Sequence, residues 1–137
     1  MAHIQWDQNY SVQVKALDEQ HQGLVEILNT LYENRDGNFS QRREIVGVAI
    51  LQLKEYACQH FTAEEKLLLQ CNYPEYTKHK EEHQLFVTTI NVFIQEYRSG
   101  SQTLSSKAID FLNDWVLNHI LVADKQYTPF LKELGIH

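Results

Sequence analysis

Apolar residues recur in steps of three and four along four stretches of this chain of 137 residues. That spacing places side chains on one face of an α-helix, because a helix completes a turn in about 3.6 residues. Only two prolines and five glycines interrupt the pattern. The sequence lacks the long alternation of apolar and polar residues that is typical of a strand with one exposed face. The sequence therefore predicts an all-α protein.

The breaks in this pattern give the expected helix boundaries. Asp18 and Ser40 are suitable N-caps for the first two helices, and Pro74 suits the first turn of the third. Thr128 and Pro129 interrupt the fourth helix. The predicted helices are 18–34, 41–70, 74–98 and 104–127.

Short connections between four helices favour an up-down-up-down four-helix bundle. We expect a single domain, residues 1–137, in which residues 17–127 form the bundle. Residues 1–16 form an N-terminal arm that packs on the body through Trp6 and Tyr10. Residues 128–137 form a short C-terminal helical tail.

Each predicted helix carries histidine on its apolar face. Five interior histidines share this placement: His21, His60, His79, His83 and His119. A lone histidine on such a face is most often a satisfied core residue. Five that converge from four helices are hard to satisfy in that way, since protonated rings repel each other and neutral rings need buried partners. A metal resolves the conflict, because each neutral nitrogen coordinates it. His3 and His137 lie at the termini, where we expect disorder.

His79 and His83 lie four residues apart in the stretch HKEEH. On a helix both rings would leave the same face, about 6 Å apart along the axis. The likeness to the zinc-protease pattern H-E-x-x-H is superficial. That chemistry needs a glutamate base directly after the first histidine, and this chain has Lys80 there.

Two carboxylates are candidates to join the histidines. Glu64 follows His60 by four residues and shares its face. Asp124 follows His119 by five residues, or about 140° on an ideal helix. It reaches the same centre only if the backbone bulges near residues 121–123, and a surface charge at a helix end is the alternative. Three other glutamates are predicted to be solvated surface charges: Glu65, Glu81 and Glu82.

Seven such groups exceed what one ion takes, because a zinc site normally has about four ligands. Two ions that share the set are more consistent, with each carboxylate bridging them through its two oxygens. One bridging oxygen from solvent then leaves one coordination position empty. Mixed imidazole and carboxylate ligation suits iron or manganese, with zinc and copper as competitors. The Glu-x-x-His motif of ferritin-like enzymes is missing, and an imidazole-rich site favours reversible binding over oxygen activation.

Charge and hydropathy argue against several partners. The net charge of −6 argues against nucleic acid. No apolar run reaches the roughly 20 residues that span a bilayer, and the first ten residues show no secretory leader, so we expect a cytoplasmic protein without membrane insertion. Cys58 and Cys71 are interpreted as buried thiols without a disulfide.

Five segments that together span nearly the whole chain carry a resemblance to a known family. They are WDQNYSV at 6–12, LDEQH at 17–21, HFTAEE at 60–65, YPEYTKHKEEH at 73–83 and DWVLNHILVADKQY at 114–127. In this order they resemble the bacterial hemerythrins. The resemblance implies a bundle that binds O2 reversibly at two non-haem iron ions (Fe2+ or Fe3+) joined by an oxo or hydroxo bridge. The implied ligands are His79, His83 and His119 for one iron, His21 and His60 for the iron with the open position, and Glu64 and Asp124 as bridges.

Two positions depart from the pattern of that family. Val116 follows Trp115 directly, where the family usually has leucine. If Val116 faces the pocket, it leaves more room for water, and we expect faster autoxidation. Gln13 stands where the family often has glycine, which bears on the backbone shape of the arm.

Non-enzymatic O2 carriage, storage or delivery is the function we expect. The alternative is a di-iron enzyme that reduces peroxide or scavenges nitric oxide or O2. Tyr56, one turn before His60, is its candidate proton donor, although a core aromatic is the simpler interpretation. O2 sensing is a third possibility and would need a separate partner, since 137 residues leave no room for an output domain. No segment identifies a protein partner.

Overall fold

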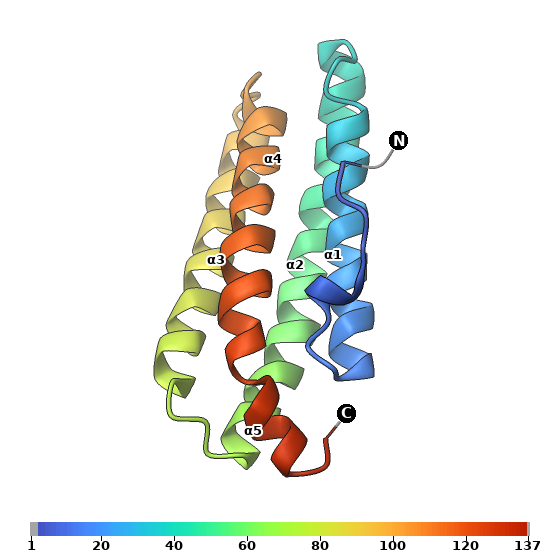
Figure 1. The fold of residues 1–137 in the computed structure, drawn as a ribbon. Helices are drawn as coiled ribbons and strands as arrows, with labels where there is room; N and C mark the ends of the chain where they lie inside the picture. Colours follow the sequence, from blue (N-terminus) through green and yellow to red (C-terminus); the bar gives the residue numbers. More distant parts are fainter. Residues whose placement is uncertain (1–2, 137) are drawn as a thin grey trace.

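Four long helices lie side by side, each antiparallel to the next along the chain (Figure 1). The computed structural model describes residues 3–136. Its helices are α1 (Lys15–Glu33), α2 (Phe39–Gln70), α3 (Tyr76–Arg98), α4 (Leu104–Asp114), the π-helix η2 (Trp115–Asp124) that continues α4, and α5 (Thr128–Glu133). A short 3-10 turn, η1 (Gln8–Tyr10), lies in the N-terminal arm. The predicted all-α bundle is confirmed.

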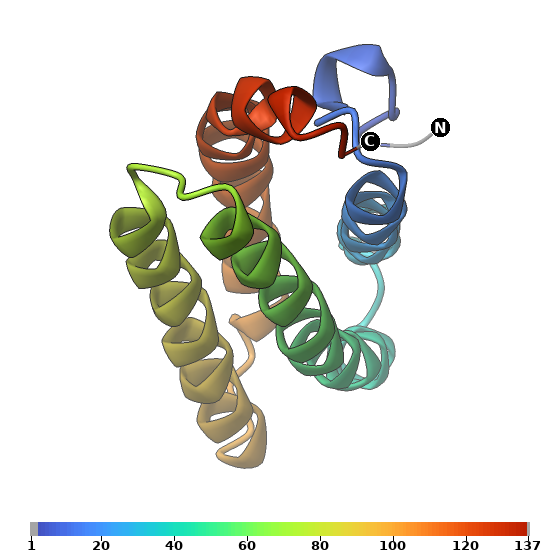
Figure 2. The same cartoon turned by 90° about the horizontal axis from the view of Figure 1, so that it is seen from below.

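Figure 2 shows the four-helix bundle from the end that carries α5. α2 packs against both α1 and α3, and α4 also contacts α1 and α3. α5 turns away from η2 and crosses this end toward the N-terminal arm. Within residues 3–136, none of the helices combines the length and the apolar character needed to cross a membrane.

The starts of α2 and α3 differ from the prediction. Asn38, instead of Ser40, caps α2. The Asn38 side-chain oxygen accepts from the Gln41 N–H (2.9 Å), and Gln41 Oε1 accepts from the Asn38 N–H (3.1 Å). Two donors that a helix start leaves unpaired are thus satisfied reciprocally. α3 begins at Tyr76, so Pro74 precedes the helix and does not enter its first turn.

The N-terminal arm is fastened to α1 through Asp18. Asp18 was predicted to be the N-cap of this helix. Because α1 begins at Lys15, Asp18 lies instead within its first turn. Its carboxylate accepts hydrogen bonds from Ser11 Oγ (2.6 Å) and from the Val12 N–H (2.8 Å). Gln13 has a φ of 61°, in the left-handed region that favours glycine. This backbone shape gives a physical reason for the glycine often found here in the proteins that the sequence resembles.

The start of the arm also packs on the bundle. His3 stacks on Tyr32 at 3.8 Å between ring centroids, and its Nε2 lies 2.7 Å from Asn113 Oδ1. The backbone N–H and C=O of Ile4 both bond to the side chain of Asn29 at 2.8 Å. The expected disorder at His3 is therefore wrong. The other terminal histidine, His137, lies outside the described residues.

Both cysteines are free thiols, as expected. Cys58 is exposed and Cys71 is half-buried. The interpretation of two buried thiols is therefore wrong, because position 58 falls on the outer face of α2.

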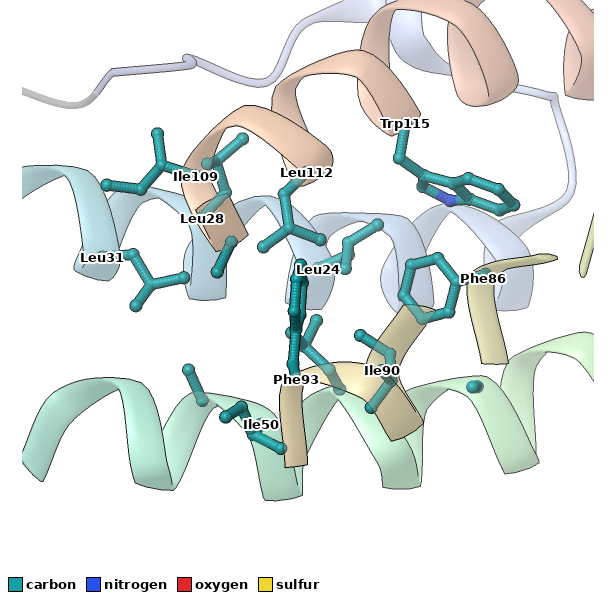
Figure 3. Close-up of a cluster of buried hydrophobic side chains, with 14 of the residues drawn as sticks. Leu24, Leu28, Leu31, Ile50, Phe86, Ile90, Phe93, Ile109, Leu112 and Trp115 are labelled. Atoms are coloured by element: carbon teal, nitrogen blue, oxygen red, sulfur yellow. The ribbon is translucent and has the colours of Figure 1, made fainter. Parts of the chain in front are cut away.

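Two clusters of buried apolar side chains divide the interior. The larger cluster fills the bundle and includes Leu24, Leu28, Phe86, Ile90 and Leu112 (Figure 3). The smaller cluster closes one end and comprises Val12, Val14, Leu17, Leu68, Tyr73, Tyr127 and Leu131. On α1, Leu17 belongs to the smaller cluster and Leu24 to the larger, with His21 buried between them. A polar layer is therefore enclosed by apolar residues on both sides.

We expect Asp18→Ala to lower the free energy of unfolding by about 1–3 kcal/mol, because the N–H of the fully buried Val12 loses its acceptor. Urea unfolding followed by circular dichroism measures the change. The matched control is Glu19→Ala, which alters the neighbouring exposed residue and should cost less than about 0.5 kcal/mol. Equal losses in the two variants would show that Asp18 does not hold the arm.

Candidate metal centre

Seven buried polar residues meet in the layer between the two apolar clusters. All four helices of the bundle contribute, and each of the seven residues is at most 5% exposed. They are His21 from α1, His60 and Glu64 from α2, His79 and His83 from α3, and His119 and Asp124 from η2. The structure thus brings together every residue that the sequence predicted for the site.

Three histidines face one side of the two carboxylates. His79 Nε2 lies 2.6 Å from Glu64 Oε1 and 2.9 Å from Asp124 Oδ1. His83 Nε2 lies 3.0 Å from Glu64 Oε1. His119 Nε2 lies 2.9 Å from Asp124 Oδ1. We call these three residues the three-histidine group.

Two histidines face the other oxygens of the same carboxylates, and we call them the two-histidine group. His60 Nε2 lies 3.0 Å from Glu64 Oε2, and His21 Nε2 lies 3.1 Å from Asp124 Oδ2. The two Nε2 atoms are 3.0 Å apart. Each carboxylate therefore turns one oxygen toward each group. On either side, the candidate ligand atoms all lie within 4.8 Å of one another.

Asp124 reaches the layer because the fourth helix changes its winding. A π-helix bonds residues five apart, and η2 spans Trp115–Asp124. It brings Asp124 onto the face of His119, whereas an ideal α-helix would place them about 140° apart. The backbone irregularity predicted near residues 121–123 is present, and it begins earlier than expected.

Several buried polar atoms in this layer have no hydrogen-bond partner within residues 3–136. They are Nδ1 of His21, Nε2 of His83, Nε2 of His119 and both carboxylate oxygens of Asp124. Asp124 Oδ1 lies 2.9 Å from the Nε2 atoms of His79 and His119 without a satisfactory hydrogen bond, although buried polar groups are nearly always paired. Cations between the converging Nε2 and carboxylate lone pairs would satisfy the two Nε2 atoms and both Asp124 oxygens. The donor set of imidazole and carboxylate fits iron or manganese.

The charges of the layer also fit a cation site. Burial favours the neutral imidazole, but contacts with Asp124 and Glu64 outweigh it and raise the pKa of His21 to about 9 and that of His79 to about 10. Burial and the charge of Glu64 would raise the pKa of Asp124, but His119 and His21 hold it well below its usual value. Without a metal, the carboxylates draw protons onto His21 and His79 in place of a cation.

Three of the histidines are held from behind, at Nδ1, by a residue of the preceding helix. The pairs are Gln20–His60 (2.6 Å), Glu65–His83 (2.8 Å) and Glu82–His119 (3.1 Å). Each of these outer residues is the direct sequence neighbour of a residue in the layer. Its side chain leaves the helix about 100° away from that neighbour and so meets the next helix.

The sequence predicted two of these outer partners wrongly and did not indicate the third. The prediction that Glu65 and Glu82 are solvated surface charges is wrong: their side chains are 20% and 33% exposed, and each pairs with an imidazole. Glu81 is exposed, as predicted. Gln20 was not identified, and neither was Tyr127, whose fully buried hydroxyl donates to Glu64 Oε2 at 3.0 Å. The spacing within one helix cannot reveal contacts that depend on how two helices face each other.

Aromatic rings stack on three of the histidines. The pairs, by distance between ring centroids, are Trp115–His119 (3.9 Å), Phe61–His83 (3.9 Å) and Tyr56–His60 (4.9 Å). The Tyr56 hydroxyl and the Trp115 indole nitrogen are buried and complete no hydrogen bond within the described chain. Burial, together with the charges of Asp124 and Glu64, raises the pKa of Tyr56 well above its usual value, and the nearby indole offsets this only in part. The hydroxyl therefore keeps its proton.

Comparison with known proteins decides the family. The model of the Hemerythrin HHE cation binding domain matches residues 12–131. The chain belongs to the hemerythrin family. A bacteriohemerythrin of Stenotrophomonas maltophilia is 28% identical to it over 132 residues, which cover 96% of this chain and 84% of the relative. A hemerythrin-like protein of Naegleria gruberi is 31% identical over 126 residues, 92% of each chain.

Solved hemerythrin structures have the same fold. A wild-type hemerythrin superposes with a TM-score of 0.75 at 26% identity, over 95% of this chain and 98% of the other. A hemerythrin with one leucine replaced by alanine gives 0.76 at 27% identity, over 96% and 98%. Hemerythrins are generally O2-binding proteins and not enzymes. The buried histidine and carboxylate layer of this hemerythrin is suited to a metal.

We expect Tyr127→Phe to lower the free energy of unfolding of the metal-free protein by about 1.5–3 kcal/mol, because a buried carboxylate loses a hydrogen-bond donor. Urea unfolding of chelator-treated protein measures this change. Tyr73→Phe is the matched control, since its ring lies in the same apolar cluster and its hydroxyl makes no hydrogen bond to a described side chain. Similar losses in both variants would mean that the Tyr127 hydroxyl does not support Glu64.

Proposed function

We propose that this chain binds O2 reversibly at a pair of iron ions, for carriage, storage or delivery. The observation that carries the proposal is the sharing of Glu64 and Asp124, each of which turns one oxygen toward the three-histidine group and the other toward the two-histidine group. Such sharing supports two ions joined by two carboxylate bridges. Membership of the hemerythrin family supports iron as the metal and O2 as the ligand.

All seven residues of the layer are ligands in this proposal. His79, His83 and His119 hold one ion, His21 and His60 hold the other, and Glu64 and Asp124 bridge them. When present, an iron pair held by these residues would supply the electrons for reversible O2 binding. The two-histidine group offers one nitrogen fewer, which supports an open position on its side.

Apolar side chains of the larger cluster adjoin the layer and would keep water from the ions in this proposal. Leu24 lies one turn from His21, and Val116 and Ile120 lie within one turn of His119. All three apolar side chains are fully buried. Such an environment disfavours charged or strongly hydrated ligands, because they would lose their hydration without gaining new partners. A neutral diatomic molecule loses little hydration on entry.

An enzyme that reduces peroxide or scavenges nitric oxide or O2 is the second candidate. One observation favours it, the buried Tyr56 hydroxyl on a ring stacked against His60. This unpaired group has a hydrogen to donate to a ligand held beside that histidine.

Three further expectations stay predictions: O2 sensing through a separate partner, a cytoplasmic location and the absence of a nucleic-acid partner.

The test is to measure iron content together with the optical spectrum through reduction, air exposure and deoxygenation. We expect a pair of irons per chain and charge-transfer bands that appear in air and disappear under argon. Irons that oxidise at once and stay oxidised would favour the enzymatic candidate. A single zinc ion, or no metal, would contradict the proposal.

We expect Val116→Leu to slow autoxidation about three-fold or more, because one added methylene, worth about 0.8 kcal/mol of apolar burial, leaves less room for water. Val116 is fully buried in the larger apolar cluster, three residues before His119. The rate at which the O2-dependent bands decay in air measures the effect. Val122→Leu, at a position of η2 that is 53% exposed, is the control. An unchanged rate in Val116→Leu would exclude Val116 as a determinant of water access.

A further inference from the structure

The hydrogen bonds behind the histidines divide the two groups unequally. In the three-histidine group, His83 and His119 each have a carboxylate at Nδ1, from Glu65 at 2.8 Å and Glu82 at 3.1 Å. Two negative charges therefore support this group from outside.

The two-histidine group has weaker outer support. His60 has a neutral amide oxygen at Nδ1, from Gln20 at 2.6 Å. His21 Nδ1 is buried and has no partner among the described residues. Among residues 3–136, no negative charge supports either imidazole of this group at Nδ1.

A carboxylate behind an imidazole changes how strongly the ring binds a metal. It fixes the tautomer and the orientation of the ring and raises the basicity of the coordinating nitrogen. Removing such an outer partner typically costs 10–100-fold in metal affinity. The three-histidine group thus has one more nitrogen than the two-histidine group, and two of its nitrogens are stronger donors.

The shared carboxylates add to the difference. Tyr127 donates its hydrogen bond to Glu64 Oε2, the oxygen that faces the two-histidine group, and so withdraws electron density from that side. A first ion on the other side would also neutralise part of the charge of Glu64 and Asp124 before a second ion arrives. Each contribution weakens binding at the two-histidine position.

We propose that the two metal positions fill in order, the three-histidine position first and tightly, the two-histidine position second and more weakly. Glu65 and Glu82 are the positioning residues that establish this order. The inference rests on the proposed set of seven ligands, but it does not depend on iron or on O2. It also implies a half-loaded state that retains metal and lacks the ion on the side proposed for O2, so that chelators abolish O2 binding before they remove all the metal.

Anaerobic titration of the metal-free protein with Co2+, followed by its visible absorption and by competition with a chelator, tests this order. We expect one equivalent of Co2+ to bind at least 10-fold more tightly than the next. Glu82→Gln and Glu65→Gln should each weaken binding at the three-histidine position by about 10–100-fold, so that the difference in affinity between the two steps becomes smaller or disappears. Gln20→Ala should weaken the second step alone.

The matched control is Glu81→Gln, which removes the same charge from the neighbouring, exposed position of α3 and should change neither step. Because the side chain of Glu82 is 33% exposed, the fold should tolerate its replacement, and circular dichroism of each metal-free variant checks this. His21→Ala gives a second measure: it should retain the tight Co2+ step and lose the weak one.

Two indistinguishable steps in the wild type, or loss of the tight step in His21→Ala, would overturn the proposal. An equal effect of Glu81→Gln and Glu82→Gln would overturn the role of Glu82. These outcomes are separable from failure of the proposed function. Ordered Co2+ loading in a protein whose iron form does not bind O2 reversibly would contradict only the O2 proposal, whereas no Co2+ binding at all would contradict both.

Discussion

The burial of two carboxylates at the centre of the bundle is the constraint on which the rest of the structure depends. Glu64 and Asp124 are fully buried, and two like charges in a place without water are strongly destabilising unless positive charge surrounds them. Five imidazoles lie at contact distance from them, and positive charge can be present there either as protons on His21, His79 and His119, whose pKa values are raised, or as the proposed metal ions. The imidazoles must approach from several directions, so each helix of the bundle has to present a histidine at the same level. The register of the helices and the assembly of the site therefore depend on each other. A shift of one turn in any helix would remove a histidine from the layer.

Apolar packing on both sides of the layer keeps the histidines of the four helices at the same height along the bundle. The larger cluster extends from Leu24 on one side of His21, and the smaller one, with Leu17 on the other side, is completed by the arm and by α5. The smaller cluster also contains Tyr127, whose hydroxyl donates to Glu64. Closure of this end therefore serves the site directly: the arm, anchored at Asp18, covers the residues that orient a carboxylate.

Much of this could be predicted from sequence because helix periodicity is a local property. The apolar faces, the five histidines and Glu64 lie in steps of three and four, and that spacing alone places them inward. Asp124 could not be settled in this way, since its position depends on ten residues of π-helix that no local rule demands. The resemblance to the hemerythrins supplied what spacing could not. Glu65 and Glu82 were misjudged for a related reason: they leave the inner face of their own helix, and only the neighbouring helix decides whether they meet water or an imidazole.

The unequal outer support also bears on why the open position would fall where it does. A metal that exchanges a small ligand needs an incomplete set of protein donors, and an incomplete set holds the ion less firmly. In this chain the poorer set of nitrogens coincides with the poorer outer hydrogen bonds, at His21 and His60. The ion with the open position would then be retained chiefly through the two bridging carboxylates, whose other oxygens belong to the firmly held neighbour. Retention of the ligand-binding ion would thus depend on the ion that binds no ligand.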